Sequence, residues 1–234
     1  IRILESDALL VAAYGQILSV KLLESARFGG INLHGSLLPK YRGAAPIQRA
    51  ILEGESVTGV TLMQMDKGMD TGDEIARASL EIDPDETAGG LTPRLAELAA
   101  GLAVEWMPKI VDGSVVRIPQ DHASATMAPK VEKSEAELST DRAAAVEYNR
   151  FRAFTPSPGA WLSSEHGPVK LVRVRTSELT LSAGKVQASG GALHLGFAGG
   201  SLALEQVQPP GKRPMSGADL ANGWRLVPGS RWPR

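Results

Sequence analysis

The chain has 234 residues and a formal net charge of −1. With 43% hydrophobic and 22% charged residues, its composition is that of a folded globular protein rather than a disordered one. The absence of cysteine excludes disulfide scaffolds, thiol nucleophiles and cysteine-ligated metal centres. No apolar run is long enough to cross a bilayer and no signal peptide is visible, so we expect a cytoplasmic protein without a membrane partner.

The charge is distributed unevenly along the chain. Residues 134–234 hold 12 Lys and Arg against 8 Asp and Glu, whereas residues 1–133 hold 13 against 18. A change of sign along a chain is typical of two units with different partners. Differences of a few charges are also common by chance, so the charge alone leaves both interpretations open.

The first part of the sequence alternates between strand-like and helix-like segments. Residues 7–13 form a continuous apolar run, which is typical of a strand buried on both faces. The predicted strands are 7–13, 31–33, 58–65 and 74–80, and the predicted helices are 18–26, 46–53 and a longer one that begins at 92. This alternation predicts an α/β unit with a mostly parallel sheet, ending near residue 112.

The second part of the sequence has a different pattern of predicted elements, with short strands in place of the strand–helix alternation. Residues 117–133 have little hydrophobic periodicity and contain Pro119 and Pro129, so we interpret them as a linker. A helix is then predicted over 140–152. It is followed by short strands over 169–174, 185–188, 192–197 and 201–207 and by a short helix over 216–222. Short strands separated by Gly-rich turns predict a small barrel or sandwich.

Three polar residues form the most informative pattern in the sequence. Asn32 and His34 lie two apart at a probable strand end, so their side chains share one side of the strand. Asn can donate to a developing oxyanion, and His can move protons near neutral pH. Asp70, in a loop after a later strand, could orient His34 and stabilise its charged form.

Each of these residues also has a purely structural explanation. A histidine near a strand end is often a hydrogen-bonded structural residue, and Asn and Asp are common in turns. One His and one Asp are too few ligands for a metal, so no metal site is expected. The spacing by itself therefore leaves a catalytic and a structural interpretation open.

Longer motifs resemble those of the folate-dependent formyltransferases. The two most specific segments are residues 32–49, NLHGSLLPKYRGAAPIQR, and residues 59–73, GVTLMQMDKGMDTGD. Both are most similar to the branch of the family that formylates methionyl-tRNA. Residues 152–156, RAFTP, and residues 208–216, QPPGKRPMS, resemble segments of the second domain of that branch. The resemblance covers nearly the whole chain.

The resemblance implies a Rossmann-like, mostly parallel catalytic domain and a small OB-like β-barrel domain. It places a partial catalytic domain over residues 1–116, a linker over 117–133 and the tRNA-binding domain over 134–234. It also implies that the chain takes 10-formyltetrahydrofolate as formyl donor and initiator methionyl-tRNA as acceptor, without a metal. We expect a monomer.

The resemblance also assigns residues to the site. The family's catalytic trio falls on Asn32, His34 and Asp70. The residues expected near the folate are Ser36, Leu37, Leu38, Pro39, Tyr14, Gly15, Ile17, Leu18 and Asp66. Because basic surface supplies affinity for phosphate, the residues expected to bind tRNA are Lys130, Lys133, Arg173, Arg175, Lys212 and Arg213.

Two alternatives stay open at this point. The family normally has further strands before the point that matches Ile1, so the isolated chain is expected to be unstable or poorly active. The chain could then be a non-catalytic remnant that binds folate or tRNA. It could also be a formyltransferase for a small amine such as an amino sugar, which would share the trio without needing a basic second domain.

Overall fold

The computed structural model describes residues 5–15 and 18–233. The chain divides into two compact units. The first unit holds residues up to 50 together with 55–84 and 90–130, and the second holds 51–54, 85–89 and 131–234. Each unit is built around its own sheet.

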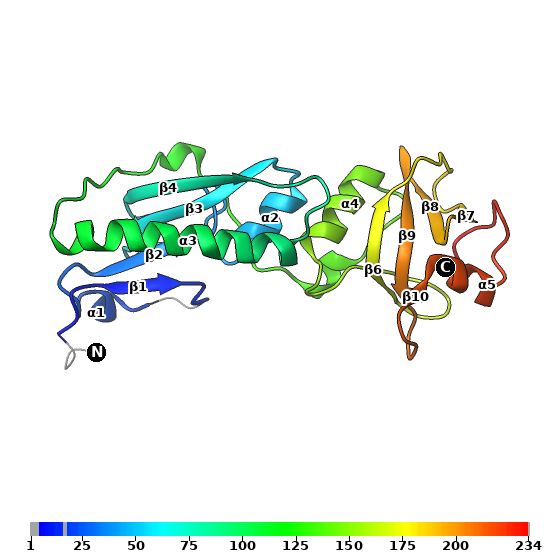
Figure 1. Cartoon of the computed structure of the whole chain (residues 1–234), viewed down its shortest axis with the longest axis horizontal. Coiled ribbons are helices and arrows are strands. Elements are labelled where there is room, and N and C mark those ends of the chain that lie inside the picture. The colour runs from blue at the N-terminus through cyan, green and yellow to red at the C-terminus, as the bar shows by residue number, and fades with distance from the viewer. Residues whose placement is uncertain (1–4, 16–17, 234) are drawn as a thin grey trace. The chain divides into compact units, whose positions relative to one another are not determined.

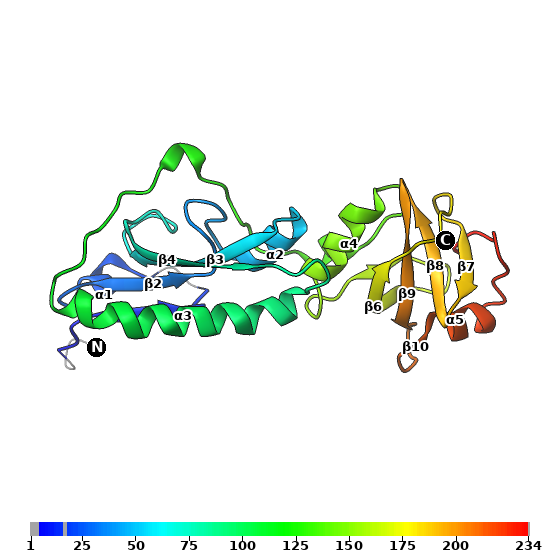
Figure 2. The same cartoon turned by 45° about the horizontal axis from the view of Figure 1, so that its top comes forward.

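The first unit contains a four-stranded sheet in the order β1-β2-β3-β4 (Figure 1). The elements of this part of the chain are β1 (Leu9–Ala12), α1 (Val20–Leu23), β2 (Gly30–His34), α2 (Pro46–Leu52), β3 (Val57–Gln64), β4 (Glu74–Glu81) and α3 (Ala88–Val111). The long helix α3 runs along one face of the sheet (Figure 2). Its Trp106, Met107 and Ile110 pack against a core that includes Ile31 of β2 and Leu62 of β3.

The sheet is mixed rather than mostly parallel, which corrects part of the sequence-based expectation. Only β1 and β2 pair in parallel, whereas β2 with β3 and β3 with β4 are antiparallel. A parallel crossover needs a dozen or more residues. The connection between Gln64 and Glu74 is shorter than that, so β4 returns beside β3 as an antiparallel neighbour.

Several helices differ from their predicted bounds. α1 is shorter than the predicted 18–26, although Ser19 caps it as a helix start by accepting from Leu22 N. α3 begins at Ala88, four residues before the predicted start, and it contains Pro93. The longest helix is still not a membrane candidate, since no helix within the described residues is long and apolar enough to cross a bilayer.

The second unit contains an antiparallel sheet in the order β5-β6-β9-β8-β7, with β10 paired to β9 (Figure 1). Its elements are α4 (Ala144–Ala153), β5 (Trp161–Leu162), β6 (Val169–Thr176), β7 (Val186–Ser189), β8 (Ala192–Phe197), β9 (Gly200–Gln208), β10 (Met215–Ser216) and α5 (Gly217–Gly223). A single apolar core joins the sheet to α4 and α5, with Phe151, Phe197 and Leu220 among its buried members.

The pairings in this second sheet do not close into a barrel. β5 and β7 form its two edges, and no pairing between them occurs among the strands that the structure describes. The short strands predicted a small barrel or sandwich, and the structure has a single antiparallel sheet there, so the OB-like barrel is not confirmed. The two shortest strands, β5 and β10, were not predicted, because two-residue strands carry no measurable alternation.

The segment interpreted as a linker makes backbone bridges inside the first unit. Ile118 exchanges hydrogen bonds with Glu74 at 2.8 Å in both directions. Further along, Arg42 N donates to Thr126 O at 2.9 Å and Ala128 N donates to Arg42 O at 2.6 Å. This part of the chain therefore runs beside the loop that follows β2.

Candidate active site

The structure brings Asn32, His34 and Asp70 together at the end of β2. Asn32 and His34 lie opposite Met63 and Thr61 of β3, so their side chains share one face of the sheet. Asn32 Nδ2 lies 3.4 Å from Asp70 Oδ1, and His34 Nδ1 lies 3.6 Å from Asp70 Oδ2. The carboxylate of Asp70 thus lies beside both other members of the predicted trio.

Asp70 is held in an unusual backbone conformation. Its φ is +53°, in the left-handed region that Asp and Asn tolerate better than most residues. Gly43 N donates to Asp70 Oδ2 at 2.9 Å. Gly43 has a φ of +117°, and a Cβ added there would come within 2.8 Å of Ala128 O. Glycine is therefore required at residue 43 for this backbone donor to reach the carboxylate.

His34 lies between two acceptors. Its side chain is only 6% exposed, Nε2 lies 2.9 Å from the Tyr41 carbonyl oxygen, and Nδ1 faces Asp70. Because a carbonyl oxygen only accepts, the Nε2–H donates to it. Nδ1 then lies 3.6 Å from Asp70 Oδ2. The imidazole is therefore held between the Tyr41 carbonyl and the Asp70 carboxylate, on the same side of β2 as Asn32.

Gln120 is a residue of this site that the sequence analysis missed. It is 5% exposed, and its Nε2 donates to Asp70 O at 2.9 Å and to Gly72 O at 2.7 Å. Its Oε1 accepts from Arg42 Nη2 at 2.6 Å, and Arg42 is itself 6% exposed. Both N–H donors of this amide are therefore directed at the loop that carries Asp70, and its oxygen is directed at Arg42. Gln120 belongs to no recognisable sequence motif and lies fifty residues after Asp70, so nothing in the sequence connects the two.

We expect Gln120→Glu to lower kcat about 10–100-fold, because misplacing a catalytic group by about 1 Å can cost that much. The carboxylate still accepts from Arg42 but cannot donate to the carbonyls of Asp70 and Gly72. Formyl transfer measured per folded molecule checks this, with Gln187→Glu on β7 as the matched control. A lower melting temperature with full kcat would show that Gln120 only stabilises the fold.

The loop predicted to line the folate site is only partly accessible. Ser36 and Leu38 are completely buried. Ser36 Oγ donates to Lys40 O at 2.6 Å, and Leu38 N donates to Thr61 Oγ1 at 3.0 Å. Among the four predicted residues, surface for a ligand is available at Leu37 and Pro39, which are half-buried.

Tyr41 anchors the far end of this loop. It has a φ of +62°, and its hydroxyl donates to Glu55 Oε1 at 2.8 Å. Lys40 Nζ lies 3.1 Å from the same oxygen. The Tyr41 hydroxyl, with a further contribution from Lys40, holds the pKa of Glu55 below its usual value. The Tyr41 carbonyl that accepts from His34 is thus fixed by its own side chain.

The other residues predicted near the folate lie in two segments. Tyr14 and Gly15 follow β1 directly and are exposed, Tyr14 by 55%, and Leu18 is half-buried. Ile17 lies outside the described residues. Asp66 is exposed, and its Oδ1 accepts from Gly68 N at 2.9 Å and from Thr71 Oγ1 at 2.8 Å. Asp66 therefore shapes the turn that precedes Asp70.

The residues predicted to bind tRNA fall into two groups. Arg173 and Arg175 each pair with an acid, because Arg173 Nε lies 2.6 Å from Glu205 Oε2 and Arg175 bonds Asp85. The Asp85 charge raises the pKa of Arg175. The remaining four, Lys130, Lys133, Lys212 and Arg213, are exposed. An ion-paired arginine offers less to a phosphate than an unpaired one, so the two groups are not equivalent.

Asp85 belongs to a wider network in the second unit that also includes buried Tyr148 and Arg152. Tyr148 on α4 donates to Asp85 Oδ1 at 2.6 Å. Burial, with a further contribution from Asp85, raises the pKa of Tyr148 to about 12. Arg152 stacks over the Tyr148 ring, with its guanidinium carbon 5.7 Å from the ring centre. Arg175 is thus part of a structural cluster as well as a surface cation.

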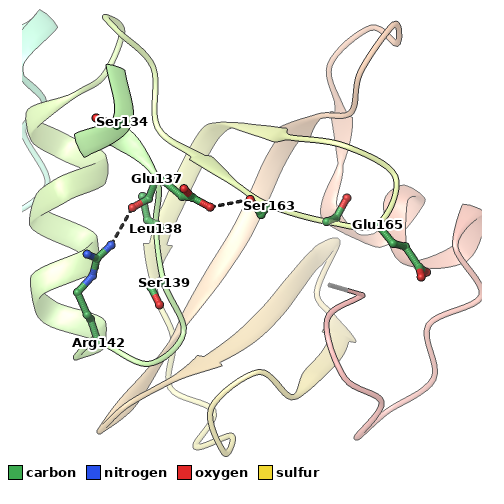
Figure 3. Close-up of a pocket in the computed structure, with 8 residues that line it drawn as sticks. Ser134, Glu137, Leu138, Ser139, Arg142, Ser163 and Glu165 are labelled. Atoms are coloured by element: carbon green, nitrogen blue, oxygen red, sulfur yellow. Dashed lines mark hydrogen bonds between the residues drawn. The ribbon is translucent and has the colours of Figure 1, made fainter. Parts of the chain in front are cut away.

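A cavity of about 570 Å³ lies in the second unit (Figure 3). Its lining residues are Ser134, Glu137, Leu138, Ser139, Arg142, Ser163, Ser164 and Glu165. None of them belongs to the trio or its surroundings. Within residues 5–15 and 18–233, no group of three or more metal-binding side chains is placed to hold a metal ion.

Comparison with known proteins defines the class. The formyl transferase family matches residues 1–109, and the formyl transferase C-terminal domain matches residues 130–225. These matches, which include all three residues of the trio, make the chain a formyl transferase. Methionyl-tRNA formyltransferase of Halorhodospira halophila is 44% identical over 232 residues, which cover 98% of this chain and 75% of the relative. The chain belongs to the methionyl-tRNA formyltransferases.

Other relatives and the fold agree with this assignment. Methionyl-tRNA formyltransferase of Koribacter versatilis is 42% identical over 94% of this chain and 70% of its own length. Among solved structures, HypX from Aquifex aeolicus in complex with tetrahydrofolic acid matches with a TM-score of 0.74 and 18% identity. The match covers 96% of this chain and 40% of HypX, and at this identity it shows the fold alone.

Proposed function

We propose that this chain transfers the formyl group of 10-formyltetrahydrofolate to the amino group of initiator methionyl-tRNA, for translation initiation. The observation that carries the proposal is the meeting of Asn32, His34 and Asp70 within hydrogen-bonding or ion-pairing distance, in a chain of this family. The free amine attacks the formyl carbon, a tetrahedral oxyanion forms, and the folate nitrogen leaves.

Each member of the trio has a role that its contacts support. Asn32 Nδ2 keeps one N–H that does not face Asp70, and this N–H donates to the oxyanion. His34 helps to stabilise the oxyanion and relays the proton that the attacking amine loses to the departing folate nitrogen, so that the protons balance. Asp70 orients the imidazole, and Gly43 N donates to the same carboxylate and fixes it in place.

The residues around the trio suit a folate. A flat, partly apolar ligand needs accessible apolar surface with a few polar groups beside it. Tyr14 is more than half exposed, Leu37 and Pro39 are half-buried, and Asp66 shapes the turn before Asp70. We propose that these residues contact the folate and that Ser36 and Leu38 act only by supporting the loop.

The remaining expectations stay proposals of the same kind. We propose a catalytic domain over residues 1–116, a connection over 117–133 and a tRNA-binding domain over 134–234. We also propose that the second domain is an open variant of the OB-like fold. Exposed Lys130, Lys133, Lys212 and Arg213 would contact phosphates. A monomer in the cytoplasm, where charged tRNA and folates occur together, completes the proposal.

Formyl transfer from labelled 10-formyltetrahydrofolate tests the proposal directly. We expect the label to appear on charged initiator methionyl-tRNA, and to be absent from free methionine and from an amino-sugar nucleotide. We also expect the apparent KM for tRNA to rise steeply with salt, as phosphate contacts require. Transfer to the small amines with none to tRNA would show a small-substrate transferase. Folate binding with no transfer to any acceptor would show a non-catalytic remnant.

A further inference from the structure

A row of polar and aromatic side chains crosses the sheet of the second unit on its outer face. Trp161 of β5 lies directly opposite Lys170 of β6, and Lys170 lies directly opposite Gln208 of β9. Their neighbours Leu162, Leu171 and Val207 are all buried in the core. Because side chains alternate along a strand, the three residues of the row share the face that points away from the core.

A cavity of about 500 Å³ lies over the beginning of this row. Its lining residues are Gly159, Trp161, Ser163, Ser164, Gly167, Pro168 and Lys170. The Lys170 side chain extends across Gly159, since a Cβ added there would lie 3.0 Å from Lys170 Cε and 3.6 Å from Nζ. The cavity therefore has a half-exposed indole on one strand and an ammonium group on the next.

The far end of the row leads into a basic turn. Gln208 Nε2 donates to Lys212 O at 3.0 Å, which holds the turn between β9 and β10. Pro210 of the same turn lies against the cavity, because a Cβ added at Gly167 would come 3.1 Å from Pro210 Cγ. Lys212 and Arg213 are exposed on this turn. One continuous surface thus runs from Trp161 to two further cations.

The cations of this surface lack the ion pairs that the neighbouring cations on β6 have. No ion pair occurs for Lys170, Lys212 or Arg213 anywhere in the part of the chain that the structure describes. Arg173, three residues after Lys170 on the same strand, is paired with Glu205. Unpaired cations keep their full attraction for phosphate, whereas a paired one must first give up its carboxylate.

The adjoining cavity of Figure 3 shares Ser163 and Ser164 with the Trp161 cavity but is lined by acidic side chains. Glu137 and Glu165 line it, and Ser163 Oγ donates to Glu137 Oε1 at 2.6 Å. Its one cation, Arg142, is paired with buried Glu147 at 2.6 Å. Glu137 also bridges the backbone of Trp161, but the residues that line the Trp161 cavity include Lys170 and no acid, so a polyanion would favour that cavity over its acidic neighbour.

We propose that this surface binds an unpaired nucleotide of RNA, with its base stacked on Trp161 and its phosphate on Lys170. Lys212 and Arg213 contact the phosphates that follow. Aromatic surface beside a line of cations is the arrangement that binds single-stranded nucleic acid, since every base can stack and every phosphate is charged. The inference rests on the proposed function only in naming tRNA as the natural source of that nucleotide.

Binding of labelled, deacylated initiator tRNA to the full chain tests the stacking part. Trp161→Leu is expected to raise Kd about tenfold, because one stacked base contributes roughly this much. Trp161→Phe keeps an aromatic face and is expected to stay close to wild type. If Leu and Phe bind alike, or if both bind as wild type does, Trp161 does not stack on a base.

The dependence of Kd on salt tests the phosphate part. Lys170→Gln is expected to lower the slope of log Kd against log salt by about one unit, the loss of a single phosphate contact. Lys185→Gln, which removes the same charge just before β7 at the opposite edge of the sheet, is expected to leave the slope unchanged. Trp161→Leu should raise Kd at every salt concentration without changing the slope. Equal slope changes for Lys170→Gln and Lys185→Gln would mean diffuse attraction to a basic domain and would overturn the assignment.

Two further measurements separate this inference from the proposed reaction. Formyl transfer at saturating tRNA should keep the wild-type kcat in Trp161→Leu, with a raised KM. A chain that binds tRNA without transferring formyl would refute the reaction, while the Kd series would still decide the role of Trp161. A labelled single-stranded RNA dodecamer is the second probe. If the wild-type chain binds neither tRNA nor this dodecamer, the inference is overturned.

Discussion

Formyl transfer by the His34→Ala chain is expected to be about 10²–10³-fold slower than by the wild-type chain, the usual cost of losing one group that stabilises an oxyanion. His34 is the member of the trio whose imidazole can relay a proton as a general acid or base. Its two acceptors, Tyr41 O and Asp70, hold the ring in one orientation. The rate is measured in a single turnover with enzyme in excess, so that product release does not hide the chemical step.

The size of this effect has to be separated from damage to the fold. His34 is almost fully buried, so the melting temperature and the folate affinity of the variant must be measured alongside the rate. His194→Ala, on β8 in the second unit, serves as the histidine control and is expected to transfer formyl as wild type does. A His34→Ala chain that is folded, binds folate and retains the wild-type single-turnover rate would remove His34 from the mechanism.

The parts of the site that lie close together in sequence could be predicted from the sequence. Asn32 and His34 share a strand, and a period of two places them on one side without any knowledge of the fold. Asp70 was proposed as the partner of His34 from its position in a loop after a later strand, and the resemblance then assigned it to the trio. Its placement depends on the turn that Asp66 organises. Local geometry and a long motif therefore sufficed for these three residues.

Other parts of the site could not be predicted because they depend on distant contacts. Gln120 touches Asp70 across fifty residues, in a segment that has no periodicity and was interpreted as a linker. The burial of Ser36 and Leu38 follows from Thr61 on the neighbouring strand, which bonds the loop from inside. Such contacts exist only once β2 and β3 have paired.

The relative direction of the strands and the pairing of charged side chains could not be predicted from the sequence either. The alternation of strands and helices predicted a mostly parallel sheet, but β3 lies between two antiparallel neighbours. Arg173 and Arg175 were counted as basic surface, yet each faces an acid on another segment. The sequence gives the number of cations in a domain, but which of them are ion-paired depends on the fold.

Asp70→Asn is expected to slow formyl transfer by about 10²–10³-fold, since it removes the negative charge that lies 3.6 Å from His34 Nδ1 and orients the ring. Asparagine has nearly the same size and tolerates the positive φ of residue 70, so the backbone should keep its conformation. Its carbonyl oxygen can still accept from Gly43 N. Asp70→Ala would add backbone strain and is the less informative variant.

Whether Asp70 acts through His34 can be decided with the double variant. If the carboxylate acts only by orienting the imidazole, Asp70→Asn should cost little once His34 is already alanine, so the two effects are not additive. If Asp70 instead takes a proton from the attacking amine itself, the two losses should multiply. The 3.6 Å between His34 Nδ1 and Asp70 Oδ2, and the fixing of the same carboxylate by Gly43, favour the first outcome. Single-turnover rates of the two single variants and the double variant, each compared with wild type, complete the cycle.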